Sequence, residues 1–190
     1  GARVGEPEYL PVDEKHPINP SSPYGISNHT AEHYIQMYTQ LYGLEHLIFC
    51  FGNVYGPRDN PKTGRVIPTF IEKMINEESP TIYGDGNQTR DFIYVLDLAE
   101  FIINNLEKNP KHKLFHLANG VQISVNGIFN ELKRLLDFKG RANYVPAIKG
   151  EIRDIVLDTT LAKKELGWKP KHYLNQGLKE TVKYFKNIRK

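Results

Sequence analysis

Hydrophobic and polar positions follow two kinds of pattern along this chain, a helical stripe and a continuous run of strand length. Residues 66–78 show the first, with apolar side chains recurring every three or four positions. Residues 46–51, HLIFCF, show the second, which is typical of a parallel strand covered on both faces. The alternation of such segments predicts an α/β fold. Further strands are expected within 81–86, 90–95, 114–118 and 155–158.

Capping residues and glycines indicate where the helices begin and end. Ser22 and Pro23 suit the cap and first turn of a helix that Gly43 stops. Asp97 and Ser124 are expected to cap two further helices. The remaining expectations are a loop over 1–20, a short helix ending at Gly167 beside a packing Trp168, and a last helix from about Asn175.

Composition narrows the possible classes of protein. The 190 residues are 39% hydrophobic and 25% charged, which is enough for a packed core, and the net charge of +3 is dispersed. Neither nucleic acid nor membrane is expected as a partner, since the chain lacks a basic patch and an apolar run of spanning length. Cys50 is the only cysteine, which fits a reducing, cytoplasmic location. Because the chain opens with Gly1 and no signal peptide, we expect a processed product, an expression product or a piece of something longer.

The first helix carries a candidate acid/base pair in SPYGISN (22–28). At 100° per residue, Tyr24 and Asn28 are expected on the buried face or its edge, with the apolar stripe of the helix. A buried phenol with a polar neighbour one turn on is a candidate for proton transfer. The alternative, which spacing alone favours, is a core tyrosine with a hydrogen-bonded hydroxyl. The expected stripe consists of Ala31, Tyr34, Ile35, Tyr38, Leu41 and Tyr42.

The same helix contains HTAEH (29–33), which matches the H-x-x-E-H pattern of one class of zinc protease. A zinc site needs histidines that converge on a protected cavity with a third ligand. His29 and His33 fall opposite the apolar stripe, on the expected solvent face. We therefore predict two solvated histidines and no metal site, with the zinc protease as a remote alternative.

Two later segments suggest a ligand site. FGNVYGPR (51–58) follows a buried strand directly, so its loop should lie at the carboxyl end of the sheet, where open α/β sheets bind ligands. YGDGNQTRDF (83–92) places Tyr83 and Arg90 on either side of a glycine-rich turn. An arginine suits a phosphate, and a tyrosine ring can stack on a base. The turn lacks the spacing of a calcium-binding loop.

Five motifs in order resemble the extended short-chain dehydrogenase/reductase family, and more closely its NAD-dependent sugar-nucleotide epimerase/dehydratase branch of UDP-glucose 4-epimerase type. The resemblance covers essentially the whole chain. It implies residues 1–60 as the C-terminal part of a Rossmann-type NAD-binding domain with the active-site helix. It implies 61–190 as mainly a nucleotide-sugar domain, with segments returning to the Rossmann sheet. The motifs are SPYGISN, FGNVYGPR, VIPTF, IYGDGNQTRDFIYVLDLA and LDTTLAKKELGWKP.

The resemblance also implies roles for individual residues. Tyr24 would take the proton of a sugar hydroxyl while hydride passes to NAD, with Asn28 in the lysine position of the Tyr-x-x-x-Lys pair and Phe51 beside the nicotinamide. The remaining implied residues would hold a UDP-sugar: Asn53 and Arg90 at the diphosphate, Val66 and Tyr83 around the uridine, and Glu151 at the ribose.

Three departures from the family pattern bear on activity. Asn28 brings no positive charge, whereas a lysine there favours the phenolate of a tyrosine, which ionises near pH ~10 when free. Cys50 and Ile148 stand where arginines are common. The family's catalytic Ser/Thr and glycine-rich fingerprint would precede Gly1. We therefore expect the C-terminal part of an epimerase that is inactive alone.

Two other expectations remain open. One is a non-catalytic module that binds a nucleotide sugar. The other is an oligomerisation module, in which the face of the first helix around Tyr34, Tyr38 and Leu41 pairs two copies as a homodimer. A separate N-terminal half could also complement the chain.

Overall fold

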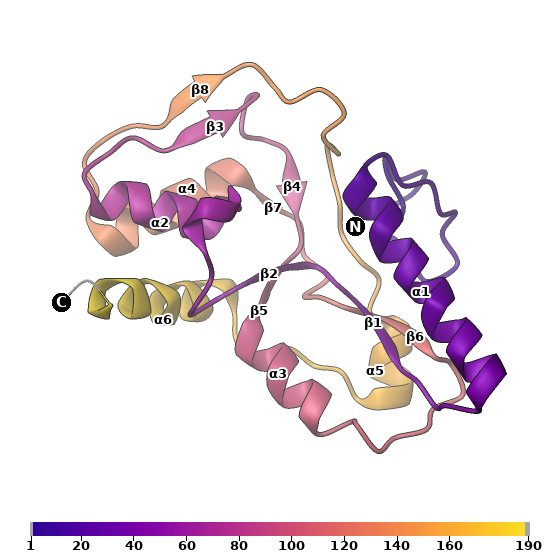
Figure 1. Ribbon diagram of the computed structural model, residues 1–190. Coiled ribbons are helices and arrows are strands. Elements are labelled where there is room, and N and C mark those ends of the chain that lie inside the picture. Colours follow the sequence, from indigo (N-terminus) through magenta and orange to yellow (C-terminus); the bar gives the residue numbers. More distant parts are fainter. Residues whose placement is uncertain (1, 189–190) are drawn as a thin grey trace.

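The computed structural model describes residues 2–188 and has the expected α/β architecture (Figure 1). The six helices of this part are α1 (Pro23–Tyr42), α2 (Val66–Ile75), α3 (Val95–Ile103), α4 (Val125–Leu136), α5 (Thr160–Leu166) and α6 (Leu174–Asn187), and a 3-10 turn, η1, spans Pro61–Thr63. The strands are β1 (Ile48–Phe51), β2 (Asn53–Tyr55), β3 (Thr81–Tyr83), β4 (Thr89–Arg90), β5 (Phe92–Tyr94), β6 (Leu114–Leu117), β7 (Ile123–Ser124) and β8 (Asn143–Val145).

The strands form four separate pairs, and strands that follow one another in the sequence pair with different partners. β1 pairs with β6, β2 with β5 and β3 with β8, all parallel, while β4 and β7 are antiparallel. The run from β1 to β2 changes its partner at Gly52, whose N–H donates to Leu117 O at 3.0 Å. A Cβ on Gly52 would lie 2.5 Å from Asp91 O, so only glycine permits this crossing. The expected loop after residue 51 therefore begins with a strand.

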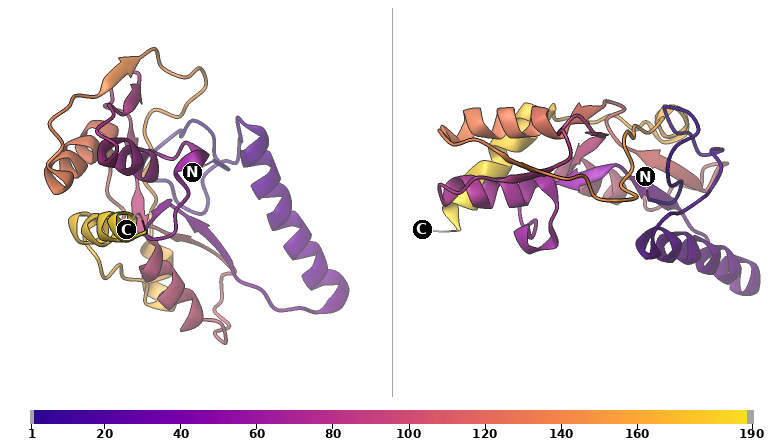
Figure 2. Two further views of the ribbon diagram at one scale, coloured as in Figure 1. Left: turned by 60° about the vertical axis from the view of Figure 1, so that its left-hand side comes forward. Right: turned by 90° about the horizontal axis from the view of Figure 1, so that it is seen from above.

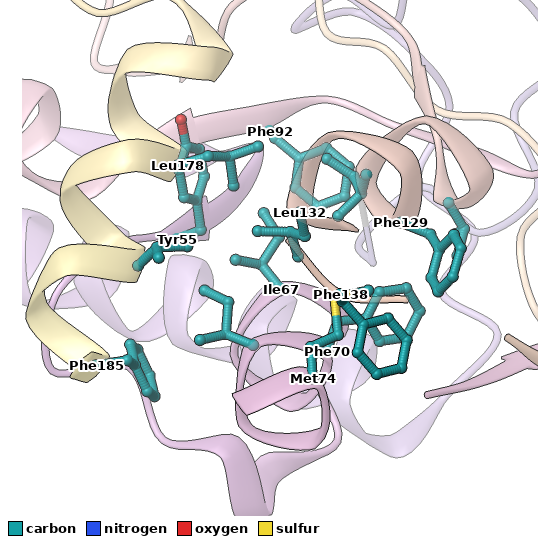
Figure 3. Packing of buried hydrophobic residues seen from close by; sticks show 14 of the residues in the cluster. Tyr55, Ile67, Phe70, Met74, Phe92, Phe129, Leu132, Phe138, Leu178 and Phe185 are labelled. Atoms are coloured by element: carbon teal, nitrogen blue, oxygen red, sulfur yellow. The ribbon is translucent and has the colours of Figure 1, made fainter. Parts of the chain in front are cut away.

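The larger core lies between α2, α4 and α6, as Figure 3 shows. The helical stripe predicted over 66–78 is confirmed, because Ile67, Phe70 and Met74 are all buried on α2. They meet Phe129 and Leu132 of α4 in this cluster. Each such side chain contributes roughly 1.5–3 kcal/mol on burial, so this core supplies much of the stability.

A second core lies under β1 and β6 and is closed by α3 and α5 (Figure 1). Phe115 and Leu117 of β6 are fully buried in it. Trp168 is also buried, and its Nε1–H donates to Ala118 O at 2.9 Å. The structural role predicted for Trp168 is confirmed, as is the helix stop at Gly167, which adopts a left-handed conformation.

α1 runs along one side of the molecule, away from α2, α4 and α6 (Figures 1 and 2). Both expected caps are confirmed: the Ser22 hydroxyl accepts from Gly25 N at 3.1 Å, and Gly43 is left-handed with φ 67°. The predicted burial is wrong, however. Tyr24 is 69% exposed, and the apolar stripe behind it is exposed as well.

The helix instead packs through its polar edge, where its only buried residues are Gly25 and Glu32. A Cβ on Gly25 would lie 2.3 Å from Ala2 O, and Glu32 forms a buried ion pair with Arg3 at 2.9 Å. These two contacts, rather than the apolar stripe, orient α1 on the described chain. His29, predicted to face solvent, is consequently half-buried beside Glu32.

Other local predictions also fail. Asp97 lies inside the first turn of α3 rather than capping it, because its carboxylate is committed to the N–H groups of Lys171 and His172 and to the His172 ring. Residues 155–158 form no strand and contribute only an isolated bridge, Val12 to Leu157. Among residues 2–188, no helix combines the length and apolar character needed to cross a bilayer.

Asp91 interrupts the strand predicted over 90–95 and joins three segments of chain. Its fully buried carboxylate accepts from the backbone N–H groups of Asn119, Gly120 and Leu157 at 3.0–3.2 Å. Burial raises the pKa of Asp91 to about 6, although these N–H groups oppose the shift. The residue thus fixes the backbone next to Arg90.

We expect Asp91→Asn to lower the free energy of unfolding at pH 7 by about 1–3 kcal/mol, because an amide has one acceptor oxygen where the carboxylate has two, so a buried N–H is left unpaired. The pKa of Asp91 is higher in the folded state, so between the two pKa values the folded chain binds more protons than the unfolded chain. The free energy of unfolding of the wild type should therefore fall as the pH rises from about 4 to about 6.

Urea unfolding across this pH range measures both effects, and the variant should lack this part of the pH dependence. An unchanged pH profile in the variant would contradict the assignment.

Candidate functional site

A cleft of about 930 Å³ lies between α1, the whole of β1, the start of β2, and residues 150–152 and 155. Residues from distant parts of the sequence meet along it, which is the arrangement expected at the carboxyl ends of parallel strands. Six of the eight residues proposed from the sequence line this cleft: Tyr24, Asn28, Phe51, Asn53, Arg90 and Glu151.

α1 places Tyr24 and Asn28 one turn apart on the wall of the cleft. Both are exposed, and within residues 2–188 neither the phenol nor the side-chain amide has a hydrogen-bond partner. The ring of Phe51, at the end of β1, is 37% exposed in the same cleft. The wall thus offers one phenol, one amide and one aromatic face to a ligand.

Arg90 contributes a charged group to the same lining. Its Nη1 donates to the carbonyl oxygens of Thr89 at 2.8 Å and Arg153 at 3.3 Å, and its Nη2 donates to Glu151 Oε1 at 2.7 Å. The carbonyl contacts hold the guanidinium on a rigid backbone. Glu151 neutralises its charge and, being 34% exposed, also faces solvent.

Two further arginines, which the sequence did not single out, also line the cleft. Arg3 is buried against Glu32, and Arg65 pairs with Asp59. Burial raises the pKa of the Asp59 carboxyl, and the charge of Arg65 opposes this rise. The one sequence signal that could have identified Arg65 as a site residue is its position immediately before the VIPTF motif. Nothing in the sequence pattern marked Arg3. Three paired guanidiniums make the lining suited to an anion that can displace or share their carboxylates.

Two of the proposed residues do not reach the cleft. Val66 is the first residue of α2, and Tyr83 lies on β3 with 47% of its surface exposed, but neither belongs to the lining. Ile148 is exposed outside it as well. Cys50 does line the cleft, but burial raises the pKa of its thiol to about 11, so it stays neutral at ordinary pH and is a poor nucleophile.

The donor set of the cleft fits one end of a dinucleotide. The unpartnered Tyr24 phenol and Asn28 amide could hydrogen-bond a ribose, and Phe51 could lie against a flat ring. No Gly-x-Gly-x-x-Gly segment exists in the sequence to cradle a pyrophosphate. Among residues 2–188, no group of three or more His, Cys, Asp or Glu side chains could hold a metal ion.

Comparison with known proteins places this chain in a family of known enzymes. The sequence pattern of the NAD-dependent epimerase/dehydratase family matches residues 2–118. A putative UDP-glucose 4-epimerase of Methanocaldococcus jannaschii is 47% identical over 98% of this chain and 61% of its own length. A UDP-glucose 4-epimerase of Mycolicibacterium smegmatis is 31% identical over 98% of this chain and 60% of its own length.

Solved structures agree with these sequence matches. The UDP-glucose 4-epimerase of Thermotoga maritima, determined with UDP-glucose, superposes with a TM-score of 0.93 at 34% identity, over all of this chain and 62% of that one. The enzyme of Thermus thermophilus, determined with NAD, gives 0.89 at 30% identity over 98% of this chain and 61% of that one. The chain thus spans about three fifths of the length of these relatives.

The Arg90–Glu151 pair predicts how the cleft responds to an anion. Glu151→Gln removes the charge that neutralises Arg90, so we expect the cleft to bind inorganic pyrophosphate more tightly, by up to about fivefold, the scale of a partly exposed ion pair. Calorimetric titration measures the change.

Glu131→Gln is the matched control. It removes the carboxylate that pairs with Arg134 on α4, and neither residue lines the cleft. Equal gains in both variants would mean that pyrophosphate responds to net charge and not to this site.

Proposed function

We propose a function from one premise: this chain belongs to the NAD-dependent epimerase/dehydratase family. Within that family we infer that it is the C-terminal, substrate-binding part of an NAD-dependent UDP-sugar 4-epimerase. The observation that carries this proposal is the shared cleft, because Tyr24 and Asn28 from α1 line the same cavity as Arg90 and Glu151 from far along the sequence. A phenol and a guanidinium around one cavity suit a ligand with both a sugar hydroxyl and a diphosphate.

A UDP-sugar fits the chemistry of the lining. Arg90 is held by two backbone carbonyls and would give its free face to the diphosphate, with Asn53 beside it. Glu151 would leave its ion pair with Arg90 and contact the ribose of the ligand instead. Val66 and Tyr83 lie outside the present cleft, so their proposed contacts with uridine would require the ligand to extend beyond it.

The family resemblance suggests a division of labour along the chain. We propose that residues 1–60 complete an NAD-binding domain and that 61–190 mainly hold the nucleotide sugar. The larger core supports this division, because all of its buried residues except Tyr55 come from between Ile67 and Phe185. The second core, which contains Phe115 and Trp168, fits segments that return to the first domain.

Tyr24 would act as the acid/base of the reaction by taking the proton of the sugar hydroxyl. When bound, NAD would supply the reversible oxidation of the carbon that carries this hydroxyl. Asn28 and Phe51 would hold the nicotinamide end through a ribose hydrogen bond and ring contact. Asn28 cannot add the positive charge that favours a phenolate, so proton transfer should be slow at neutral pH.

We propose that the chain is inactive when alone. The exposed apolar stripe of α1 would be covered by protein outside the chain, either a complementing N-terminal half or a second copy in a homodimer. The uncharged amide of Asn28 favours a second candidate, a nucleotide-sugar-binding module without catalysis. A reducing, cytoplasmic setting fits the single thiol of Cys50.

Binding of UDP-glucose to the 190-residue chain tests the proposal. We expect Arg90→Met to weaken binding about tenfold or more, because a charge-assisted hydrogen bond contributes about 1.5–3 kcal/mol. Isothermal titration with UDP-glucose and competition by UDP measure this effect.

Arg134→Met, outside the cleft, is the control and should bind as the wild type does. Absence of heat with the wild type, or equal affinity of wild type and Arg90→Met, would refute a nucleotide-sugar site here.

Turnover tests the role of residue 28. We expect no conversion of UDP-galactose to UDP-glucose by the chain alone with added NAD. In a protein that joins this chain to the missing part of its relatives' length, Asn28→Lys should raise kcat at neutral pH at least tenfold, because a cation then favours the phenolate.

Ser27→Lys adds the same charge at the adjacent position of α1 and should give no gain. Tyr24→Phe should abolish the gain, and a gain that survives it would exclude Tyr24 as the acid/base.

A further inference from the structure

The polar edge of α1 brings two histidine rings together outside the cleft. His29 and His33 are one turn apart, their ring centroids are 4.5 Å apart, and their Nε2 atoms are separated by 3.1 Å. Neither histidine lines the cleft, so the pair is separate from the proposed substrate site. Two imidazoles whose Nε2 atoms face each other at this distance share a proton, and after a change of tautomer they can bind a metal ion together.

A carboxylate fixes the orientation of one ring. Glu32 Oε2 lies 3.3 Å from His29 Nδ1, and the same oxygen is held by Arg3 Nη2 at 2.9 Å. Because a carboxylate paired with a guanidinium is an acceptor only, neutral His29 carries its proton on Nδ1 and donates it to Glu32. Its Nε2 is therefore left with a free lone pair directed at His33.

This arrangement resembles the surroundings of metal-bound histidines, which typically donate the other ring N–H to a carboxylate. Glu32 is itself well anchored, since it is only 7% exposed and its ion pair with Arg3 is buried. The support for His29 is thus already in place before any ligand arrives. A solvated surface histidine would have no such fixed partner.

The distance between the nitrogens matches two bonds to one ion. With metal–nitrogen bonds of about 2.0–2.1 Å, two ligands lie about 2.9 Å apart at a right angle and about 3.3 Å apart at the tetrahedral angle. The 3.1 Å between His29 Nε2 and His33 Nε2 falls between these values. Imidazole pairs of this kind suit zinc, nickel and copper.

We propose that His29 and His33 form a two-histidine binding site for a divalent first-row transition-metal ion on α1, with Glu32 as the positioning residue and water completing the coordination. His33 donates its Nε2 proton to His29 when no ion is bound, so binding requires His33 to carry its proton on Nδ1 instead. Both Nε2 lone pairs then face the ion. With two protein ligands the site differs from the three-ligand centre of a zinc protease, and it revises the expectation of two solvated histidines.

Titration of the 190-residue chain with Zn²⁺ and, separately, Ni²⁺ tests the site. We expect saturable binding of one ion by the wild type and at least tenfold weaker binding by His33→Gln. His33 is exposed, and circular dichroism checks that the variant folds as the wild type does. Glu32→Gln should weaken binding about 10–100-fold, as loss of an outer carboxylate partner does.

His112→Gln is the matched control. His112 also has a carboxylate partner, Glu165, but among residues 2–188 no histidine pairs with it, so its loss should leave affinity unchanged. Equal binding by the wild type and His33→Gln, or no saturable binding by the wild type, would show that the two rings are only hydrogen-bonded to each other and would overturn the proposal.

Discussion

The crossing of two backbone segments at Gly52 and Asp91 is the constraint on which the rest of the structure depends. Gly52 allows one run of chain to pass from the β6 side to the β5 side, because a side chain there would collide with the Asp91 carbonyl. The Asp91 carboxylate then ties this crossing to the loop after β6 and to Leu157. Phe51, Asn53 and Arg90, the neighbours of these two residues, therefore enter the cleft as one rigid group.

The other wall of the cleft is attached differently. α1 contacts the described chain through a glycine and an ion pair, so its position rests on two polar or backbone contacts rather than on a large apolar interface. Its apolar stripe is left exposed, which is costly in water unless other protein covers it. The proposed role of Tyr24 accordingly depends on contacts beyond those within this chain, whereas that of Arg90 does not.

Electrostatics separate binding from catalysis in this cleft. Three guanidiniums line it and each is paired with a carboxylate, so the lining can receive a diphosphate without carrying unpaired charge when empty. The phenol, by contrast, has an amide one turn away where a cation would favour its ionised form. On the other edge of α1, Glu32 of the Arg3–Glu32 pair also orients His29. One ion pair therefore both positions the helix and supports the proposed metal site.

The sequence by itself determined the elements whose signals are local. The Ser22 and Ser124 caps, the stop at Gly43 and the buried stripe of α2 all depend on residues within a few positions of one another. Tertiary structure decided the rest, because it depends on partners far along the chain. Contact with Ala2 and Arg3 turned the apolar side of α1 outward, and Lys171 and His172 claimed the Asp97 carboxylate that could have capped α3. Periodicity identifies an apolar face, but only the surrounding chain determines whether anything packs against it.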